Sequence, residues 1–206
     1  MSAQHPPSHQ RIPIFPLGSV LYPGGTLALQ IFEPRYVDMV SERLKRDAPF
    51  GVCLIREGGE TGPAAVPHDV GTLAHIADWE RLPNGLLGLS ARGGARFRIE
   101  TREVQPNQLT VADVAALPDD PPRPVPARHA GLLEVLAALR RRLGRPFPDP
   151  DDPGGGAEAG WVAYRLAELL PLPLSMRQEL LEVDDPEARL DRLAAAVETL
   201  IRRSGE

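Results

Sequence analysis

Hydrophobic and polar residues alternate with period two from about residue 12 to residue 117, and the apolar positions of residues 127–203 recur at helical spacing. Period two is typical of strands, and a period near 3.6 is typical of amphipathic helices. The chain is therefore predicted to be an α+β protein in which the strands precede the helices. Its predicted parts are a disordered N-terminus at 1–10, a β domain at 11–117, a proline-rich linker at 118–127 and a helical subdomain at 128–203.

Two apolar stretches, residues 27–32 and 50–55, each alternate in a way that predicts a core strand covered on at least one face. Three further strand-like runs between residues 71 and 103 are separated by Pro83-Asn84-Gly85 and by Gly93-Gly94. Glycine and asparagine tolerate the positive φ of tight turns. This stretch therefore predicts a β-meander with a turn at both places.

The last of these runs alternates sharply, so that Phe97 is predicted to face the core while Arg96, Arg98 and Arg102 face the other way. Such a row of arginines could contact nucleic acid. Base stacking, however, needs aromatic side chains on the face that carries the charges, and Phe97 points away from it. The other interpretation is a solvated outer strand face on which Glu100 balances the arginines.

The segment QIFEPRYVDMV joins the first core strand to a predicted helix. Glu33 precedes a proline, which disfavours helical conformation, and Pro34 suits the first helical position. Apolar residues at helical spacing then predict a helix over 34–46. Its apolar stripe is predicted to consist of Tyr36, Val37, Val40 and Leu44.

This charged corner has two interpretations. In the first, Glu33 and Arg35 only hold the fold, through the helix dipole and an ion pair. In the second, the corner also lines a groove for a partner, because the apolar residues Phe32 and Tyr36 lie beside it. General acid and base catalysis would require two carboxylates with different pKa values, and only one is present here.

Four amphipathic helices are predicted in the second part of the chain. The first two span about 129–143 and 158–170. A short third helix begins with a capping box formed by Ser175 and Gln178. The last begins with Asp185 as the capping residue and Pro186 as its first residue.

The net charge of the chain makes nucleic acid a less plausible partner. The formal net charge is −5 and the pI is about 5.6, which disfavours nucleic acid because affinity for phosphates comes from a basic face. No apolar run reaches the roughly 18 residues that a membrane span needs, and no signal peptide is evident. The single cysteine, Cys53, has apolar neighbours and fits a reducing compartment. A cytoplasmic location without membrane attachment is therefore expected.

The scarcity of lysine excludes one reaction type and argues against another. Of 23 basic residues only Lys45 is a lysine. A nucleotide-binding P-loop needs glycines that lead to a lysine and a hydroxyl, and the sequence SERLKRDAP around Lys45 has no such string. A Ser-Lys catalytic dyad would also require Lys45, which is predicted to be a solvated surface side chain.

Metal and thiol chemistry have little support. The sequence contains no CxxC or HExxH motif, and its five histidines are scattered. His75 and Asp78 are the nearest pair, but three residues apart on a strand they face opposite ways unless a bulge intervenes. Cys53, between Val52 and Leu54, is typical of an inert core thiol. We therefore expect no catalytic residue, no metal site, no cofactor and no enzymatic activity.

A series of motifs runs in order along nearly the whole chain. The first, IPIFPLGSVLYPGGTLALQIFEPRYVDMV, contains a strand ending in FPL, a VLYPG turn, an apolar strand and an FEPRY-type helix start. GTLAHI, LPNGLLGLSARGGARFRI and LAELLPLPLSMRQELLEVDDPEARLDRL follow. Together these motifs resemble the N-terminal, substrate-binding domain of the Lon protease family over roughly residues 11–201.

The resemblance implies a PUA-like β-barrel with a short inserted helix, followed by a bundle of about four helices. It also implies recognition of a substrate or partner. In full-length Lon proteases an AAA+ ATPase and a Ser-Lys protease follow this domain. The present chain is expected to stop before either, like the stand-alone Lon-domain proteins of bacteria, so neither activity is implied.

We predict a non-catalytic module that binds polypeptide segments or a protein partner, with unfolded clients as the main case. The predicted binding residues lie at the corner and on the hairpin at 79–88: Leu29, Phe32, Glu33, Arg35, Tyr36, Trp79 and Leu86. RNA binding, suggested by the PUA-like fold and the arginines, and a small ligand in the barrel mouth are the alternatives. The sequence leaves the oligomeric state open.

Overall fold

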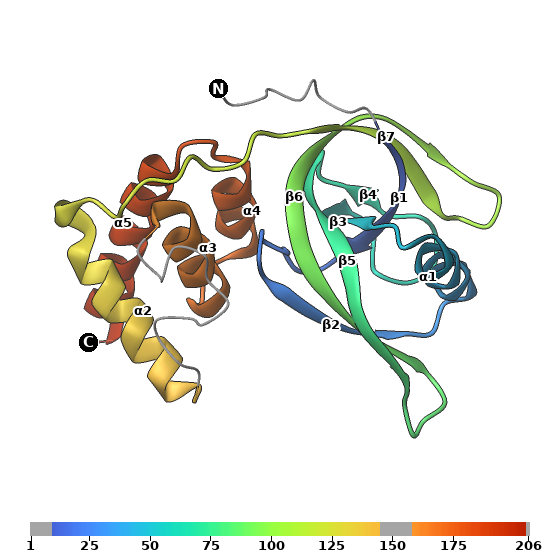
Figure 1. Ribbon diagram of the computed structural model, residues 1–206, viewed down its shortest axis with the longest axis horizontal. Helices are drawn as coiled ribbons and strands as arrows, with labels where there is room; N and C mark the ends of the chain where they lie inside the picture. The colour runs from blue at the N-terminus through green and yellow to red at the C-terminus, as the bar shows by residue number, and fades with distance from the viewer. Residues whose placement is uncertain (1–9, 145–157, 205–206) are drawn as a thin grey trace. The chain divides into compact units, whose positions relative to one another are not determined.

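The computed structural model describes residues 10–144 and 158–204, which form a β-sheet followed by helices (Figure 1). The predicted combination of a sheet and helices is confirmed. The chain divides into two compact units, one that ends at Asp119 and one that begins at Asp120. Of the N-terminal segment predicted to be disordered, residues 1–9 lie outside the described residues and Gln10 begins a strand.

The first unit contains seven strands and one helix among its described residues: β1 (Gln10–Leu17), β2 (Thr26–Ile31), α1 (Pro34–Arg46), β3 (Phe50–Glu57), β4 (Val66–Pro67), β5 (Val70–Arg81), β6 (Leu87–Val104) and β7 (Thr110–Ala116). The described residues of the second unit form five helices: the short 3-10 helix η1 (Ala127–His129), α2 (Ala130–Arg142), α3 (Ala159–Leu169), α4 (Leu174–Glu182) and α5 (Pro186–Ser204).

Strand β1 pairs with two neighbours, and this pairing closes the path of the sheet. From Gln10 to Ile14 it runs antiparallel to β7, and from Ile14 to Leu17 it runs parallel to β3. The order β1-β7-β6-β5-β3 therefore returns to β1. Pro13 and Pro16 have no N–H to donate to a second neighbour, and each lies where β1 has a partner on one side only.

The core of the first unit holds α1 against the sheet. The helix has the predicted bounds, and its Tyr36, Met39 and Val40 pack among buried residues of the strands. Val37 and Leu44, which were predicted on the apolar stripe, are each 36% exposed. The buried side of α1 is therefore centred nearer Met39 than predicted, because residues three and four apart share one side of a helix.

The two predicted core strands differ in burial. Residues 50–54 of β3 are all buried, as predicted. In β2, by contrast, Thr26, Ala28 and Gln30 are exposed and Leu27 and Leu29 are only half-buried. One face of β2 is therefore covered, as predicted, since Ile31 is buried and Leu27 and Leu29 pack against the core, but its other face is exposed.

The turn predicted at Gly93-Gly94 is absent, because β6 continues through both glycines. The Gly93 N–H donates to the Gly25 carbonyl and the Gly93 carbonyl accepts from the Gly24 N–H, both at 2.8 Å. A Cβ on Gly93 would lie 2.1 Å from the carbonyl oxygen of Tyr22. This glycine therefore admits the close approach of another backbone segment and does not reverse the chain.

The turn predicted at Pro83-Asn84-Gly85 is confirmed. It joins β5 to β6 in a hairpin that projects beyond the rest of the sheet (Figure 1). Gly85 has a φ of +82°, and the Asn84 side-chain oxygen accepts the Leu86 N–H at 3.1 Å.

The predicted row of exposed arginines on β6 is interrupted. Phe97 is buried as predicted and Arg98 is exposed. Arg96, however, is 3% exposed and donates to the carbonyl of Pro118. Arg102 lies 3.2 Å from the carboxylate of Asp69. A continuous cationic stripe is therefore not present on this strand.

The predicted helices of the second unit are confirmed, but one of their predicted caps is not. Asp185 caps α5, since its carboxylate accepts the Glu187 N–H at 3.3 Å. Helix α4 instead begins one residue before the predicted capping residue, Ser175, and no side chain caps it. Gln178 bonds to Glu182 at 2.8 Å and not back to the start of the helix.

The second unit is organised around the guanidinium of Arg189, which is fully buried. Arg189 donates to the Asp120 carboxylate at 2.6 Å and to the carbonyls of Leu180 and Val183 at 2.9 and 2.6 Å. It also lies 4.0 Å from the centre of the Tyr164 ring. One side chain of α5 thereby contacts α3, the C-terminal end of α4 and Asp120 of the predicted linker.

Replacing Asp120 with alanine is expected to lower the free energy of unfolding by about 3 kcal/mol, because it leaves a buried cation without its counter-charge. Glu198→Gln, which breaks an exposed pair with Arg202 in α5, is expected to change it by less than about 0.5 kcal/mol. Urea denaturation followed by circular dichroism measures both. Equal effects for the two variants would contradict the central role of Arg189.

Candidate functional site

Two adjoining hollows lie on the first unit and share residues 28–30 of β2. The corner hollow, of about 160 Å³, is lined by Phe15, Leu17, residues 28–33, Tyr36, Glu60 and Thr61. The hairpin hollow, of about 270 Å³, is lined by residues 28–30, residues 78–80, Leu82 and residues 88–90.

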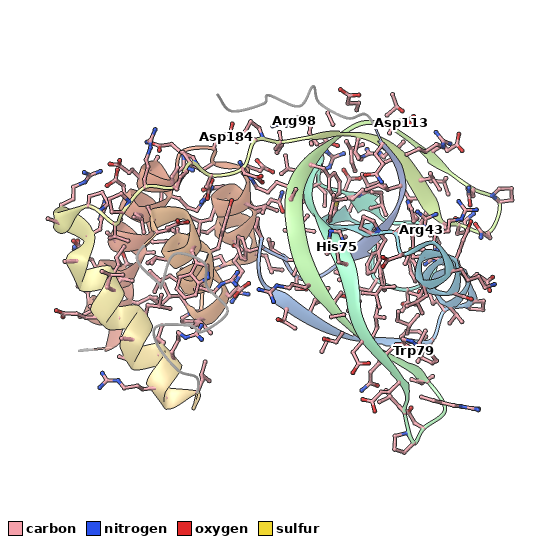
Figure 2. All side chains as sticks on the ribbon, viewed as in Figure 1. Arg43, His75, Trp79, Arg98, Asp113 and Asp184 are labelled. Atoms are coloured by element: carbon pink, nitrogen blue, oxygen red, sulfur yellow. The ribbon has the colours of Figure 1, made fainter. Side chains whose placement is uncertain are left out.

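Most of the residues that the sequence predicted to bind a partner line these hollows. They are Leu29, Phe32, Glu33, Tyr36 and Trp79. Arg35 and Leu86, also predicted, are in the lining of neither hollow. Figure 2 shows Trp79 on the projecting β5–β6 hairpin, well separated along β5 from His75.

The charged corner is built around Arg35. Glu33 has extended backbone, and its carbonyl accepts the first N–H groups of α1, from Tyr36 and Val37 at 3.0 and 3.1 Å. Arg35 is buried, lies 2.7 Å from the Glu33 carboxylate and donates to the carbonyl of Gln108 at 3.0 Å. The guanidinium thus ties the start of α1 to the β6–β7 turn and is unavailable to a partner.

Tyr36 forms part of the floor of the corner hollow. Its ring stacks on Phe15, with centroids 4.1 Å apart and an interplanar angle of 20°, and the Arg35 guanidinium lies 4.8 Å from the ring centre. Burial raises the pKa of Tyr36 above its ordinary value, an effect that Arg35 opposes and Glu33 reinforces. The hydroxyl is therefore protonated at neutral pH, and the floor of the hollow is uncharged at this position.

Two exposed aromatic side chains flank the hollows. Phe32, next to the corner hollow, is 57% exposed, and Trp79, at the hairpin hollow, is 56% exposed. In the β2-β6-β5 register Leu29 is opposite Leu89, and Leu89 is opposite Trp79. Because opposed residues project to the same face, Trp79 continues an apolar row that begins in the core. Because each of these exposed rings adjoins a hollow, this surface is a candidate binding site.

The opposite face of the same three strands is small and polar. Ala28, Ser90 and Asp78 are opposed there, as are Gln30, Gly88 and Glu80. A Cβ on Gly88 would lie 3.1 to 3.2 Å from side-chain atoms of Leu82 and Glu80, so this glycine preserves the floor of the hairpin hollow. The hairpin hollow therefore opens on this face between the carboxylates of Asp78 and Glu80, and the Trp79 ring projects from the other face of the same strands.

Groups able to support catalysis are separated from one another. Cys53 is 1% exposed, and burial raises the pKa of its thiol well above the ordinary value, which leaves it a poor nucleophile. A register irregularity does separate Ile76 from Asp78, yet Asp78 lines the hairpin hollow whereas His75 lines a third hollow of about 50 Å³ beside Arg43.

Residues 10–144 and 158–204 contain neither a cluster of metal-binding side chains nor a helix suited to cross a membrane. No group of three or more His, Cys, Asp or Glu side chains in these ranges could hold a metal ion. None of the helices in these ranges has the length and apolar character that crossing a membrane requires.

The chain belongs to the family of ATP-dependent protease La (LON) substrate-binding domains, whose sequence model matches residues 11–198. It is 27% identical over 192 residues to Lon protease 2 of Myxococcus xanthus, covering 88% of this chain and 22% of that protein. It is 30% identical over 189 residues to the Lon protease of Paraburkholderia phytofirmans, covering 87% of this chain and 23% of that protein. The chain thus spans less than a quarter of the length of these relatives.

The solved structure of a Lon N-terminal domain protein from Xanthomonas campestris matches this chain with a TM-score of 0.76 and 38% sequence identity. The match covers 90% of this chain and 98% of that one. The predicted resemblance to the Lon N-terminal domain is therefore confirmed, and the chain has the fold of that domain.

Several residues that line the hollows were not indicated by the sequence, among them Gln30, Glu60 and Gly88. Glu60 reaches the corner hollow from a distant loop and accepts the Gly18 N–H at 2.6 Å, a contact that no local pattern reveals. Gly88 did carry a signal, because a glycine within a strand often marks a close approach of neighbouring groups.

The two roles considered for the corner, holding the fold and lining a groove, predict different effects of substitutions on the free energy of unfolding. Arg35→Ala is expected to lower the free energy of unfolding by about 3 kcal/mol, because the Glu33 carboxylate and the Gln108 carbonyl lose a buried partner. Phe32→Ala removes an exposed ring and is expected to change it by less than about 0.5 kcal/mol. Chemical denaturation measures both, and a destabilisation of similar size by Phe32→Ala would assign that ring to the fold.

Cys53 is expected to react with a thiol reagent only when the first unit opens. At pH 8 the native protein should be modified at least about a thousandfold more slowly than the protein in denaturant, because reaction requires unfolding. Spectrophotometric titration with a chromogenic disulfide measures both rates. Rapid, stoichiometric reaction of the native protein would show instead that the thiol is accessible.

Proposed function

We propose that this chain is a non-catalytic recognition module that binds extended, apolar polypeptide segments over the corner and hairpin hollows. The observation that carries the proposal is the pair of exposed aromatic side chains, Phe32 and Trp79, that flank two hollows joined through β2. Membership of the LON substrate-binding domain family supports recognition as its role. Unfolded or partly folded chains expose segments of this kind and are the proposed clients.

The size of the hollows favours polypeptide side chains over a small molecule. Ligand pockets for small molecules usually enclose about 300–1,000 Å³. The corner and hairpin hollows, of about 160 and 270 Å³, are smaller. Each is better suited to one or two side chains of a longer ligand, whose remaining contacts would lie on Phe32 and Trp79.

RNA binding is the weaker of the two candidate functions. The closed strand path supports the PUA-like barrel that the resemblance implies, but a fold alone does not determine a ligand. The chain is acidic, Arg96 is buried, and Arg102 is paired with Asp69. Arg98 alone does not provide the basic surface that phosphate binding requires.

The proposal assigns no chemical step to this chain. The match covers less than a quarter of each relative named as a Lon protease, and the matched family model is that of the substrate-binding domain. A reducing, cytoplasmic setting is part of the proposal, because the chain has one cysteine and it is buried and unpaired.

A direct test uses a fluorescein-labelled nine-residue peptide in which leucine or phenylalanine alternates with threonine, with a lysine at each end for solubility. Phe32→Ala and Trp79→Ala are each expected to weaken its binding by about tenfold or more, because each removes an aromatic contact beside one of the hollows. Fluorescence anisotropy measures the dissociation constants.

Val104→Ala is the matched control, since Val104 is 53% exposed on the same unit but lies outside both hollows. It is expected to bind as the wild type does. The absence of saturable binding by the wild type, or equal weakening by all three substitutions, would contradict the proposed function.

A further inference from the structure

One edge of β2 has no partner strand among the described residues. The strand pairs with β6 along its whole length, from Thr26 opposite Arg92 to Ile31 opposite Leu87. No other described strand pairs with it. The five strands of the closed path, by contrast, each pair with at least two other strands over part of their length.

The direction of the β2 backbone groups follows from two hydrogen bonds, one made by a residue within β6 and one made by the residue that precedes β6. The Gly93 N–H donates to the Gly25 carbonyl at 2.8 Å, so Gly93 faces β2. The Leu82 N–H donates to the Leu86 carbonyl at 2.9 Å, so Leu86 faces β5. Because backbone groups in an antiparallel strand alternate sides, Leu89 faces β2 and bonds to Leu29.

The remaining residues of β2 therefore face away from β6. Thr26, Ala28 and Gln30 direct their N–H and C=O groups to the free edge, and their side chains are exposed. Such a row of donors and acceptors is complementary to another extended backbone.

The sequence of this edge lacks the features that usually prevent strand addition. Exposed edges are commonly protected by charged residues, by proline or by very short strands. Strand β4 has two of these features, since it comprises only Val66 and Pro67. The six residues of β2, TLALQI, contain no charge and no proline.

The corner hollow lies on the free-edge side of β2. Its other walls come from Phe15 and Leu17 of β1, from Glu60 and Thr61, and from the start of α1, and no residue of β6 lines it. A backbone paired with β2 would therefore have an apolar hollow beside it. Uncharged or basic segments fit best, because Asp78 and Glu80 border the neighbouring hairpin hollow.

We propose that the free edge of β2 binds an extended polypeptide as an added strand. Backbone hydrogen bonds form at Thr26, Ala28 and Gln30, and an apolar side chain of the ligand enters the corner hollow. This inference rests on the proposed function and specifies its binding mode. Main-chain bonds make affinity tolerant of sequence, whereas the hollow selects for an apolar residue at one position.

The test uses the same fluorescein-labelled peptide in two backbone-methylated forms. One form carries N-methyl groups on every second residue and the other carries them on the alternate residues. Only one set of amides faces β2 in an added strand, so one form is expected to bind at least about tenfold more weakly while the other binds like the parent peptide. This readout requires no change to the protein.

Ala28→Pro gives a second measurement, because proline removes the N–H at the centre of the free edge. A thermal melt monitored by circular dichroism establishes that the variant is folded. The folded variant is expected to bind the parent peptide about tenfold more weakly, whereas Val104→Ala binds it as the wild type does.

The outcomes separate the two proposals. If both methylated peptides bind like the parent while Phe32→Ala still weakens binding, the added strand is wrong and the proposed function stands. If the parent peptide does not bind at all, the proposed function fails and the added strand fails with it. If sedimentation shows a dimer that Ala28→Pro dissociates, the edge binds a second copy of this chain, which also overturns the proposal.

Discussion

The double pairing of β1, with β7 along its first half and with β3 along its second, is the constraint on which the rest of the β unit depends. It completes the path of the sheet without using β2. The pairing of β1 with β3 joins the two ends of this path, whereas β2, among the described strands, pairs with β6 alone and keeps a free edge along all six of its residues. The candidate binding surface is thus a consequence of how the sheet closes, and it needs no specialised loop.

At the corner between β2 and α1, some residues stabilise the start of the helix while a neighbouring residue remains exposed. Pro34 fixes the start of the helix, and Glu33, held in extended conformation, supplies the carbonyl that receives the first helical N–H groups. The turn of the helix then buries Arg35 and Tyr36 and leaves Phe32 exposed. The charged residues therefore stabilise the joint, and the neighbouring Phe32 ring remains exposed, as the proposed contact with a partner requires.

The parts of the fold that follow local rules could be predicted from the sequence. The bounds of α1 follow from Pro34 and helical spacing, and the hairpin turn follows from Asn84 and Gly85. Gly93 and Arg96 differ from the predictions because the groups that they contact, the carbonyls of Tyr22 and Pro118, lie elsewhere in the chain. Local patterns cannot reveal whether a glycine reverses a chain or admits another segment.

The candidate binding site likewise combines features that follow from local sequence with features that follow from long-range pairing. Phe32 and Trp79 could be predicted as surface candidates because each is an aromatic residue beside a turn or corner. The status of β2 could not be predicted, since TLALQI has the composition of a buried strand and only the long-range pairing shows that it is an edge. Composition and pairing together indicate a candidate binding edge. Edge strands are usually protected by charged residues or proline, and β2 has neither.

A surface of this design would discriminate between states of a polypeptide more than between sequences. A folded protein has already paired most of its backbone groups and buried its apolar side chains, so it offers neither feature that β2 and the corner hollow require. An unfolded segment offers both.

The acidic groups at the hairpin hollow add a second selection, against acidic segments, through repulsion that weakens as salt increases. Recognition by such a surface needs no reactive side chain, which is consistent with the burial of Cys53 and the separation of His75 from Asp78.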